Sequence, residues 1–522
     1  MEQANKNFDV VIVGAGVSGL AAAIRLKQQA LKNDESLSIA VIEKSAAIGA
    51  HIMGRGIIKE EVLSEIFPDW QARKAPLKDK VLKDKNIFIF NNIVVPFPKP
   101  KEFSHLGMYI VSSGELCEWL ALEAEELGVE IFLKEAAIDF YCSQDGALSQ
   151  IRTEKRVFEA KQFMLAEGAL GYISEKIIDA FNLRIRNQSY SIAFKEIWQI
   201  DSQSFDKGLN IDFFAKTKDA SHYAAGSITH IGKNQVALNF SLPLNYKNPY
   251  LDPFLEFQEF KNNAHIRSLL ENGQRLTFGA KCFACGGYKS IPKTSFAGGV
   301  IIGDSAGFSD ISQEDGVSNA MASAIAAADS VFSWFASKEP SILECDFDSN
   351  LGGYEFITKL YRFRNYYDGF KYGLLFGGIF ALLDYHFIQG RYEFDCKKNK
   401  DCNTLRRAKK SPKVDYLQDD GIIMFDRNSS MFLTNVKYEN QAESHLMGSE
   451  ESFKENLGRY DAIETRYCPS LVYEKIEEDK NISLKIDFKK CINCKLCEIK
   501  DPKQIIKWSP PFEGNGTNYK KL

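Results

Sequence analysis

The chain has 522 residues, of which 45% are hydrophobic and 26% are charged. This length exceeds what one hydrophobic core organises, so we expect several domains. The formal net charge of −4 lacks the strong basic excess of a nucleic-acid-binding protein, and we expect no nucleic-acid partner.

The amino-terminal stretch predicts the start of a dinucleotide-binding domain. In "FDVVIVGAG" an apolar strand turns on glycines into a helical pattern, and a second strand ends at Glu43. Gly14, Gly16 and Gly19 match G-x-G-x-x-G, whose glycines allow the tight turn, the approach of a pyrophosphate and close helix–strand packing. Glu43 is then placed to accept hydrogen bonds from ribose hydroxyls. The alternative is a glycine turn that binds nothing.

The first residues contain neither an apolar signal core nor an Arg-rich transit segment. We therefore expect the cytoplasmic side if the source is bacterial, or an organelle protein whose leader has been removed. Eleven cysteines suit a reducing compartment, where cysteines bind metals more often than they form disulfides.

The middle of the chain predicts a β-rich domain. Residues 190–288 alternate short strand-like runs with turns. The pair Cys282 and Cys285 has C-x-x-C spacing but no second pair and no nearby histidine. We expect these two to be small residues in a turn rather than a redox or metal site.

A second nucleotide signal follows in "GGVIIGDSAGF". An apolar strand opens onto a glycine turn before an Ala-rich helix, which places Asp304 to face the ribityl hydroxyls of FAD. This favours FAD over NAD. The alternative is that Asp304 only caps the following helix. The strand ending in "AEG" at residues 166–168 is expected to close the flavin domain, and the other expected cofactor contacts are Ala15, Ser18, Lys44, Arg55, Gly168, Gly303, Gly316 and Val317.

An apolar stretch from Tyr372 to Gly390 is broken by Asp384 and His386. It is shorter than the roughly 20 apolar residues that span a bilayer. Its length is typical of a buried core helix, and the alternative is a helix that lies on a membrane. Residues 391–455 are polar and are expected to loop over the surface.

The carboxyl-terminal cysteines predict an iron–sulfur site. Cys491, Cys494 and Cys497 follow the C-x2-C-x2-C spacing of a ferredoxin loop, but Asp-Pro stands where the fourth Cys-Pro is expected. Cys468, followed by proline, supplies that ligand from upstream. Four thiolates fit a [4Fe-4S] cluster; a tetrahedral zinc ion or unligated thiols are the alternatives.

The remaining cysteines and histidines give no such pattern. The seven histidines form no metal or nucleophile constellation. We expect ordinary core or surface thiols at Cys117, Cys142, Cys345, Cys396 and Cys402.

Over nearly its whole length the chain resembles the electron-transfer flavoprotein–ubiquinone oxidoreductase family, also called ETF dehydrogenase. The resemblance is carried by "VVIVGAGVSGL", "IGAHIM…FPDW…APL", "LNYKNPYLDPFLEFQEFK", "GGYKSIPKTSFAGGVIIG", "FDRNSSMFLTN" and the tail "RYCP…CINCKLCEIKDPKQIIKW".

The resemblance implies an α/β plus α+β architecture. A Rossmann-like FAD-binding domain takes residues 1–189 and 291–345, and a β-rich quinone- and membrane-facing domain takes residues 190–290. A membrane-associated helical and connecting region is expected at residues 346–440 and a ferredoxin-like [4Fe-4S] domain at residues 441–522.

The resemblance also implies a reaction. Reduced electron-transfer flavoprotein is the donor, electrons pass through FAD and the [4Fe-4S] cluster, and ubiquinone is the acceptor. The chain is expected to bind the surface of the respiratory membrane without spanning it, which favours the surface position for residues 372–390. No acid–base pair can be assigned from the sequence.

Two departures from the family pattern bear on the site. Tyr223 is followed by Ala224 and Ala225 where the family has Tyr-Gly-Gly against the quinone head group. Ser112 stands where the family has an arginine, and the acidic "SDISQEDG" replaces a Lys-containing segment. Loss of a cation near the flavin would disfavour its anionic reduced form and lower its potential.

Two other functions fit the same cofactors. One is a reductase of isoprenoid double bonds of the geranylgeranyl reductase type, which would deliver hydride from FAD to an alkene. The other is a non-catalytic redox-sensing adaptor. Addition of two hydrogens to a product would identify the first, and redox-inert cofactors would favour the second.

Overall fold

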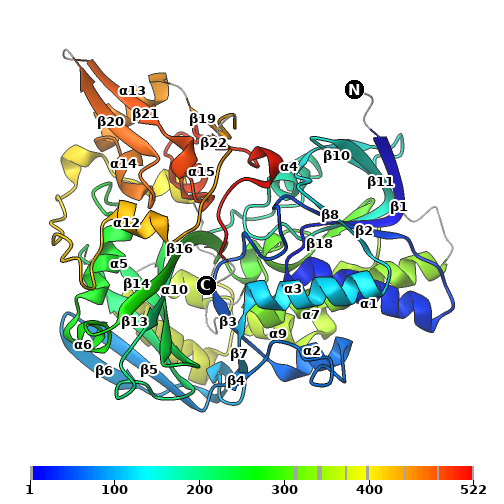
Figure 1. Ribbon diagram of the computed structural model, residues 1–522, viewed down its shortest axis with the longest axis horizontal. Helices are drawn as coiled ribbons and strands as arrows, with labels where there is room; N and C mark the ends of the chain where they lie inside the picture. The colour runs from blue at the N-terminus through cyan, green and yellow to red at the C-terminus, as the bar shows by residue number, and fades with distance from the viewer. Residues whose placement is uncertain are drawn as a thin grey trace.

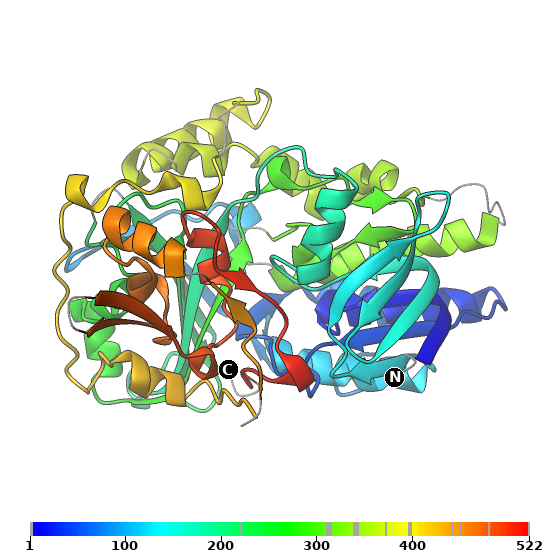
Figure 2. The ribbon, with the colours of Figure 1, turned by 90° about the horizontal axis from the view of Figure 1, so that it is seen from above.

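The computed structural model describes residues 4–219, 222–309, 316–337, 344–370, 373–394, 399–439, 442–448, 450–478 and 481–519. Cys396 and most of the acidic stretch after Ser309 lie outside these residues. The described chain forms two sheet-based units that stand side by side, with a smaller carboxyl-terminal unit against the second and the last segment of the chain running between them (Figure 1, Figure 2).

The first unit is an eight-stranded sheet that begins with the predicted strand–turn–helix. Strand β1 (Ala4–Val13) lies between β2 (Ile39–Glu43) and β11 (Arg156–Leu165), and it is parallel to both. The apolar residues from Val10 to Val13 are buried, as expected for a parallel strand covered on both faces.

Three helices and a late strand complete this unit. Helix α1 (Val17–Lys32) packs against α3 (Ser113–Glu126) and α7 (Gly316–Ser337) (Figure 1). Strand β18 (Gly299–Ile301) pairs in parallel with β11, so the chain returns to the first sheet after building the second unit. The predicted Rossmann-like dinucleotide fold is confirmed.

The second unit is a seven-stranded, mostly antiparallel sheet, as the strand-like runs at residues 190–288 predict. Its order is β16-β12-β15-β14-β13-β5-β6. The strands are β12 (Tyr190–Gln199), β13 (Leu209–Lys216), β14 (Tyr223–Ile231), β15 (Gln235–Pro243), β16 (Gln274–Ala284), β5 (Lys83–Phe90) and β6 (Ile93–Phe97).

The hairpin β5–β6 differs from the expected domain division. Its residues fall inside the range 1–189 assigned to the first domain, yet β5 pairs with β13 of the second sheet. Stacked aromatic rings join β5 to both neighbouring strands. The ring centroid of Phe88 lies 4.2 Å from that of Phe97 on β6 and 5.7 Å from that of Phe214 on β13. The residues of the hairpin itself predict its two strands, but the strand with which β5 pairs lies over a hundred residues away. A domain division that follows sequence order therefore assigns the hairpin to the wrong domain.

Helix α5 (Pro253–Lys261) covers one face of the second sheet and brings a charge into its core. The Nζ of Lys261 lies 3.1 Å from both carboxylate oxygens of Glu196, and Nη1 of Arg275 lies 3.1 Å from the same carboxylate. The side chains of Glu196 and Lys261 are completely buried. Two cations and one carboxylate therefore share the interior of this unit.

The described part of the apolar stretch, residues 373–390, forms a surface and not a buried core helix. Helix α11 (Leu374–Leu383) continues into a short π-helix (Asp384–Ile388). The side chains of Phe376, Ile379, Leu382 and Phe387, which we call the apolar helix surface, are between 53% and 75% exposed. No helix among the described residues is both long and apolar enough to cross a membrane.

The carboxyl-terminal unit is small and tied to the second sheet. It contains α14 (Glu464–Tyr467), the hairpin β20 (Tyr473–Glu478) with β21 (Asn481–Ile486), and α15 (Leu496–Lys500).

The segment from 391 to 455 is only partly the surface loop that was expected. It includes helix α12 (Arg427–Phe432) and the start of α13 (Glu450–Tyr460). Asp401 in this segment is buried and accepts the backbone N–H of Tyr190 at 2.8 Å.

Replacing Glu196 with glutamine would leave Lys261 and Arg275 buried without a counter-charge. Removing one partner of a buried pair costs about 3–5 kcal/mol, so we expect E196Q to lower the free energy of unfolding in urea by that amount. The matched control is K161M, which breaks the exposed pair with Asp9. Equal effects of the two variants would contradict the role of the buried carboxylate.

Candidate functional site

The glycine loop after β1 is shaped for close backbone contact. Gly14 has φ +109°, and a Cβ there would lie 2.4 Å from the carbonyl oxygen of Ala166. A Cβ on Gly19 would lie 1.9 Å from the carbonyl oxygen of Gly14, so helix and strand meet without room for a side chain. A Cβ on Gly16 would meet only Ile52, at 4.0 Å, on the open side of the loop. The predicted tight turn at Gly14 and close packing at Gly19 are confirmed, and the approach of a pyrophosphate at Gly16 stays a prediction.

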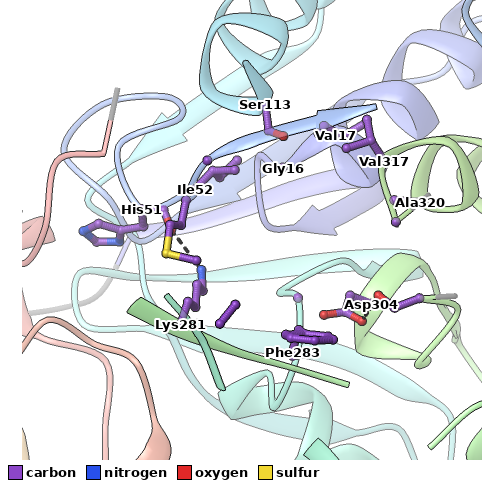
Figure 3. Close-up of a pocket in the computed structure, with 18 of the residues that line it drawn as sticks. Gly16, Val17, His51, Ile52, Ser113, Lys281, Phe283, Asp304, Val317 and Ala320 are labelled. Carbon is purple, nitrogen blue, oxygen red and sulfur yellow. Dashed lines mark hydrogen bonds between the residues drawn. The ribbon is translucent and has the colours of Figure 1, made fainter. Parts of the chain in front are cut away.

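A cavity of about 430 Å³ begins at this loop and extends to the second sheet. In Figure 3, Gly16, Val17 and Val317 lie on one side of it, and Lys281, Phe283 and Asp304 lie on the other. The expected cofactor residues that line the cavity are Gly14, Gly16, Ser18, Glu43, Lys44, Arg55, Gly168, Asp304, Gly316 and Val317.

Three expected contacts lie behind the cavity wall. Ala15 donates its backbone N–H to Glu43 at 2.9 Å, and Gly19 packs on Gly14. Gly303 has φ +61° and approaches Ser18, whose Oγ would lie 2.7 Å from an added Cβ. These residues shape the wall and do not face the cavity themselves.

Asp304 lies in the cavity, near the end of β18. Its Oδ1 accepts a hydrogen bond from Ser309 at 2.5 Å, and burial raises the pKa of its carboxyl group above the ordinary value. The helix after it, α7, is described only from Gly316 onward. A carboxylate at this point can accept from the hydroxyls of a ribityl chain.

The cavity is rich in cations that the sequence did not single out. Lys195 and Lys281 line it from the second sheet, beside Arg55 and Lys44 from the first unit. Nε of Arg55 is buried and has no hydrogen-bond partner. Burial and the neighbouring Lys44 lower the pKa of Lys281 to about 8. These donors fit a dinucleotide, whose phosphates need positive charge.

The expected loss of a cation at Ser112 therefore does not leave the cavity without positive charge. Ser112 caps α3 by accepting the N–H of Glu115 at 3.4 Å, and Lys195 and Lys281 supply ammonium groups from the other unit. Neither lysine belongs to a sequence motif. Only their position on strands that face the cavity identifies them.

The four predicted ligand cysteines converge in the carboxyl-terminal unit. Cys468, Cys491, Cys494 and Cys497 are all buried in one cluster of side chains. Burial raises the pKa of the last three thiols. Asn493 and Lys495 have positive φ, which bends the loop tightly between the cysteines.

Four cysteine thiolates are the usual ligand set of a [4Fe-4S] cluster. Backbone N–H groups of Val472 and Asn493 point at Cys468 and Cys491 sulfurs, 3.5 and 3.4 Å away.

Strand β16 lies beside both the cavity and the cysteine loop. Lys281, Cys282 and Phe283 line the cavity, and the N–H of Cys282 also donates to the carbonyl of Cys494 at 3.1 Å. Cys282 thus lies in a strand and not in the expected turn. Three extended residues separate Cys282 and Cys285 by about 10 Å, beyond disulfide range.

The expected quinone-binding residues divide between two faces of the second sheet. Ala225 lines the cavity, and Ser241 donates its hydroxyl to the carbonyl of Ala225 at 2.7 Å. Ala224 is fully buried in the core on the opposite face. Tyr223 packs against Phe370, with ring centroids 5.6 Å apart. The structure therefore does not bring the side chain of Ala224 to the cavity.

One histidine does join a possible ligand group, contrary to the expectation. Asp84, His105 and Asp212 place ligand atoms within 4.8 Å of one another. The Nζ of Lys99 lies 2.8 Å from Asp84 and 3.1 Å from His105, and it also contacts Asp212. Hydrogen bonds from His105 and Lys99 hold the pKa of Asp84 well below its ordinary value despite burial. The ammonium group of Lys99 therefore supplies the positive charge that pairs with Asp84 and Asp212.

Family models match three parts of the chain. The model for the 4Fe-4S domain of electron transfer flavoprotein-ubiquinone oxidoreductase matches residues 421–520, and the model for the ubiquinone-binding part of ETF-QO matches residues 190–283. An NAD(P)-binding Rossmann-like model matches residues 12–62. The 4Fe-4S match begins before the expected boundary at residue 441.

Full-length relatives carry the same name. The electron transfer flavoprotein-ubiquinone oxidoreductase of Pseudomonas aeruginosa is 34% identical over 100% of both chains. The mitochondrial proteins of that name from Arabidopsis thaliana and Homo sapiens are 35% and 34% identical. They cover 98% and 99% of this chain, and 84% and 90% of their own length is matched.

Solved structures share the fold. A geranylgeranyl bacteriochlorophyll reductase-like protein of Thermoplasma acidophilum has a TM-score of 0.57 at 16% identity, covering 76% of this chain and 95% of its own. The flavin-dependent brominase Bmp2 has a TM-score of 0.50 at 18% identity, covering 75% and 95%. At these identities the likeness concerns the fold alone.

Removing a thiol ligand should release iron. We expect C468A and C494A to lower iron content after anaerobic purification by at least about tenfold, because even the loss of a supporting contact weakens metal binding by 10–100-fold. The control is C142A, which changes an exposed thiol. Unchanged iron in C468A would mean that the fourth ligand is another residue.

Proposed function

The chain belongs to the electron transfer flavoprotein–ubiquinone oxidoreductase family, and we propose which of its residues perform that family's electron transfer from reduced electron transfer flavoprotein to ubiquinone. It is an electron-transferring-flavoprotein dehydrogenase with FAD and a [4Fe-4S] cluster as cofactors. Bound FAD takes up two electrons and releases them singly, whereas the cluster carries one at a time.

The position of strand β16 carries this proposal. The cavity wall at Lys281 and Phe283 and the amide of Cys282 that holds the loop of Cys494 belong to the same strand. One strand therefore lies between the proposed flavin site and the four proposed cluster ligands, Cys468, Cys491, Cys494 and Cys497. This short separation suits electron exchange between the two cofactors.

We propose that the two ends of the cavity bind the two halves of FAD. The loop of Gly14 to Gly19 and the start of α7 offer backbone N–H groups to the pyrophosphate. Glu43 is proposed to hold the adenosine ribose; its two carboxylate oxygens already accept the N–H groups of Ala15 and Ser45 at 2.9 and 2.8 Å, which fixes their orientation. Asp304 is proposed to hold the ribityl chain.

The quinone is proposed to reach the flavin across the second sheet. Small side chains, among them Ala193, Ala225 and Ala237, line the cavity there and leave space for a flat ring. Tyr223, at the end of the same strand as Ala225, contacts Phe370 of helix α10 (Tyr366–Phe370). That helix packs against α11, which carries the apolar helix surface. We propose this apolar side of the second sheet as the one from which a membrane-soluble acceptor approaches the cavity.

Membrane association follows from the family. We propose that the apolar helix surface rests in the membrane interface at the cytoplasmic face of a bacterial inner membrane, or at the mitochondrial inner membrane. A relative of Pseudomonas aeruginosa matches over the full length, and eleven cysteines suit a reducing compartment.

The two rival functions are not favoured. The geranylgeranyl reductase-like neighbour shares the fold at 16% identity, whereas the relatives with about twice that identity are named electron transfer flavoprotein-ubiquinone oxidoreductases. A redox-sensing adaptor is not favoured either, because relatives matched over nearly the full length of this chain are named oxidoreductases.

The activity test uses the purified holoenzyme, reduced electron transfer flavoprotein and a short-chain ubiquinone. We expect oxidation of the donor with matching quinone reduction. Hydrogen bonds to a charged group contribute about 1.5–3 kcal/mol, so D304A should bind FAD roughly 10–100-fold more weakly, while D145A, in an exposed turn, should not. An enzyme that holds flavin and iron but never oxidises the donor would refute the function.

Membrane binding is tested with liposomes. Burying one large apolar side chain contributes about 1.5–3 kcal/mol, so we expect F387D to bind at least about tenfold more weakly in a flotation assay. L31D is the control, because Leu31 is an exposed leucine on α1, away from α11 (Figure 2). Equal weakening by both variants would argue against the apolar helix surface.

A further inference from the structure

Residues 50–55 form a segment along one wall of the cavity, and we call it the strap. It joins β2 to strand β3 (Arg55–Ile58), and every residue from His51 to Arg55 lines the cavity. The strap is attached to the first unit, because β3 pairs with β7 (Tyr109–Ser112), which runs directly into α3. It also contacts the second sheet. It is therefore the part of the dinucleotide site where the two units meet.

Two lysines of the second sheet reach the two ends of the strap. Nζ of Lys281 donates to the carbonyl of His51 at 2.9 Å, and Nζ of Lys195 donates to the carbonyl of Arg55 at 3.0 Å. Lys195 lies opposite Gly279 in the ladder of β12 and β16, two residues before Lys281. Side chains two residues apart on a strand share a face, so both lysines project from the same face of the sheet.

Gly54 supports the same arrangement independently. Its φ is +93°, and a Cβ at this position would lie 2.3 Å from Cδ and 2.8 Å from Nζ of Lys195. The lysine side chain occupies the space where any other residue would place its first carbon. Only glycine lets Lys195 cross the strap at this point.

The strap is also held from the end of the chain. The N–H of Tyr519 donates to the carbonyl of Ala50 at 2.8 Å, and a Cβ on Gly516 would lie 2.9 Å from Nε2 of His51. The carbonyl groups of Ala50, His51 and Arg55 thus accept hydrogen bonds from three distant segments of the chain. The carbonyl of Gly54 accepts from the N–H of Ser113, at the start of α3.

We propose that Lys195 and Lys281 are positioning residues that lock the strap over bound FAD, so that retention of the cofactor depends on the second unit. The proposal rests on the proposed function only for the presence of FAD in the cavity. Bonds from an ammonium to a carbonyl are stronger than neutral ones, above all where water is excluded. The two ammonium groups also place positive charge beside a ligand that carries two phosphates.

The test measures FAD release and strap mobility in the holoenzyme. We expect K281M and K195M to release FAD about tenfold faster or more after dilution, since each loses a hydrogen bond from a charged group. Amide hydrogen exchange should speed up in residues 50–55 but not in residues 10–13. K281R should restore slow release, and K161M, at an exposed site, should behave like the unmodified enzyme.

The outcome is readable without any electron transfer. Neither measurement uses electron transfer flavoprotein or ubiquinone, so an inactive enzyme would leave the result intact. The proposal would be overturned if the double variant K195M/K281M retained its iron and showed the same rates of FAD release and of amide exchange in the strap as the unmodified enzyme. If K281M loses its iron, the G54A variant is used in its place. This substitution displaces Lys195 without removing a charge, and unchanged FAD release in G54A would equally overturn the proposal.

Discussion

The hydrogen bond from the amide of Cys282 to the carbonyl of Cys494 joins the two cofactor sites of this protein. It holds the cysteine loop against strand β16 at 3.1 Å, and Lys281, Cys282 and Phe283 of the same strand line the cavity. A shift of β16 by one residue would turn the side chain of Lys281 to the opposite face of the sheet. The long ladder between β16 and β12 fixes the register, so the relation between flavin and cluster depends on the second sheet.

Buried and half-buried lysines connect the units of the molecule. Lys281 and Lys195 reach from the second sheet to the first unit, and Lys495 of the cysteine loop donates to the carbonyl of Leu170 in the first unit. Lys500 donates to the carbonyls of Leu244, Tyr246 and Asp401 at 2.7–3.0 Å, which ties the cysteine unit to the second sheet. A buried ammonium is costly unless its donors are satisfied. Each of these lysines therefore favours one arrangement of two units over any other.

The second sheet also connects the cavity to the apolar helix surface. One of its faces packs under α5 with aromatic side chains such as Phe257 against Phe194, and the other carries the small and polar residues of the cavity. Strand β14 of this sheet begins at Tyr223, and the hairpin β5–β6 forms one edge of the sheet. The same sheet that fixes the register of β16 thus also carries the residues at the proposed quinone entry.

The sequence by itself determined the features that depend on short-range geometry. The glycines at 14, 16 and 19 and the cysteines at 491, 494 and 497 act through the conformation of a few adjacent residues, so their spacing alone reveals them. Only the tertiary structure decided that β5–β6 belongs to the second sheet, that Cys282 holds the cysteine loop, and that Lys195 and Lys281 reach the strap. These roles depend on which distant strand a segment pairs with and in which register. A strand presents alternate faces, and nothing in its own residues states which face will meet the cofactor.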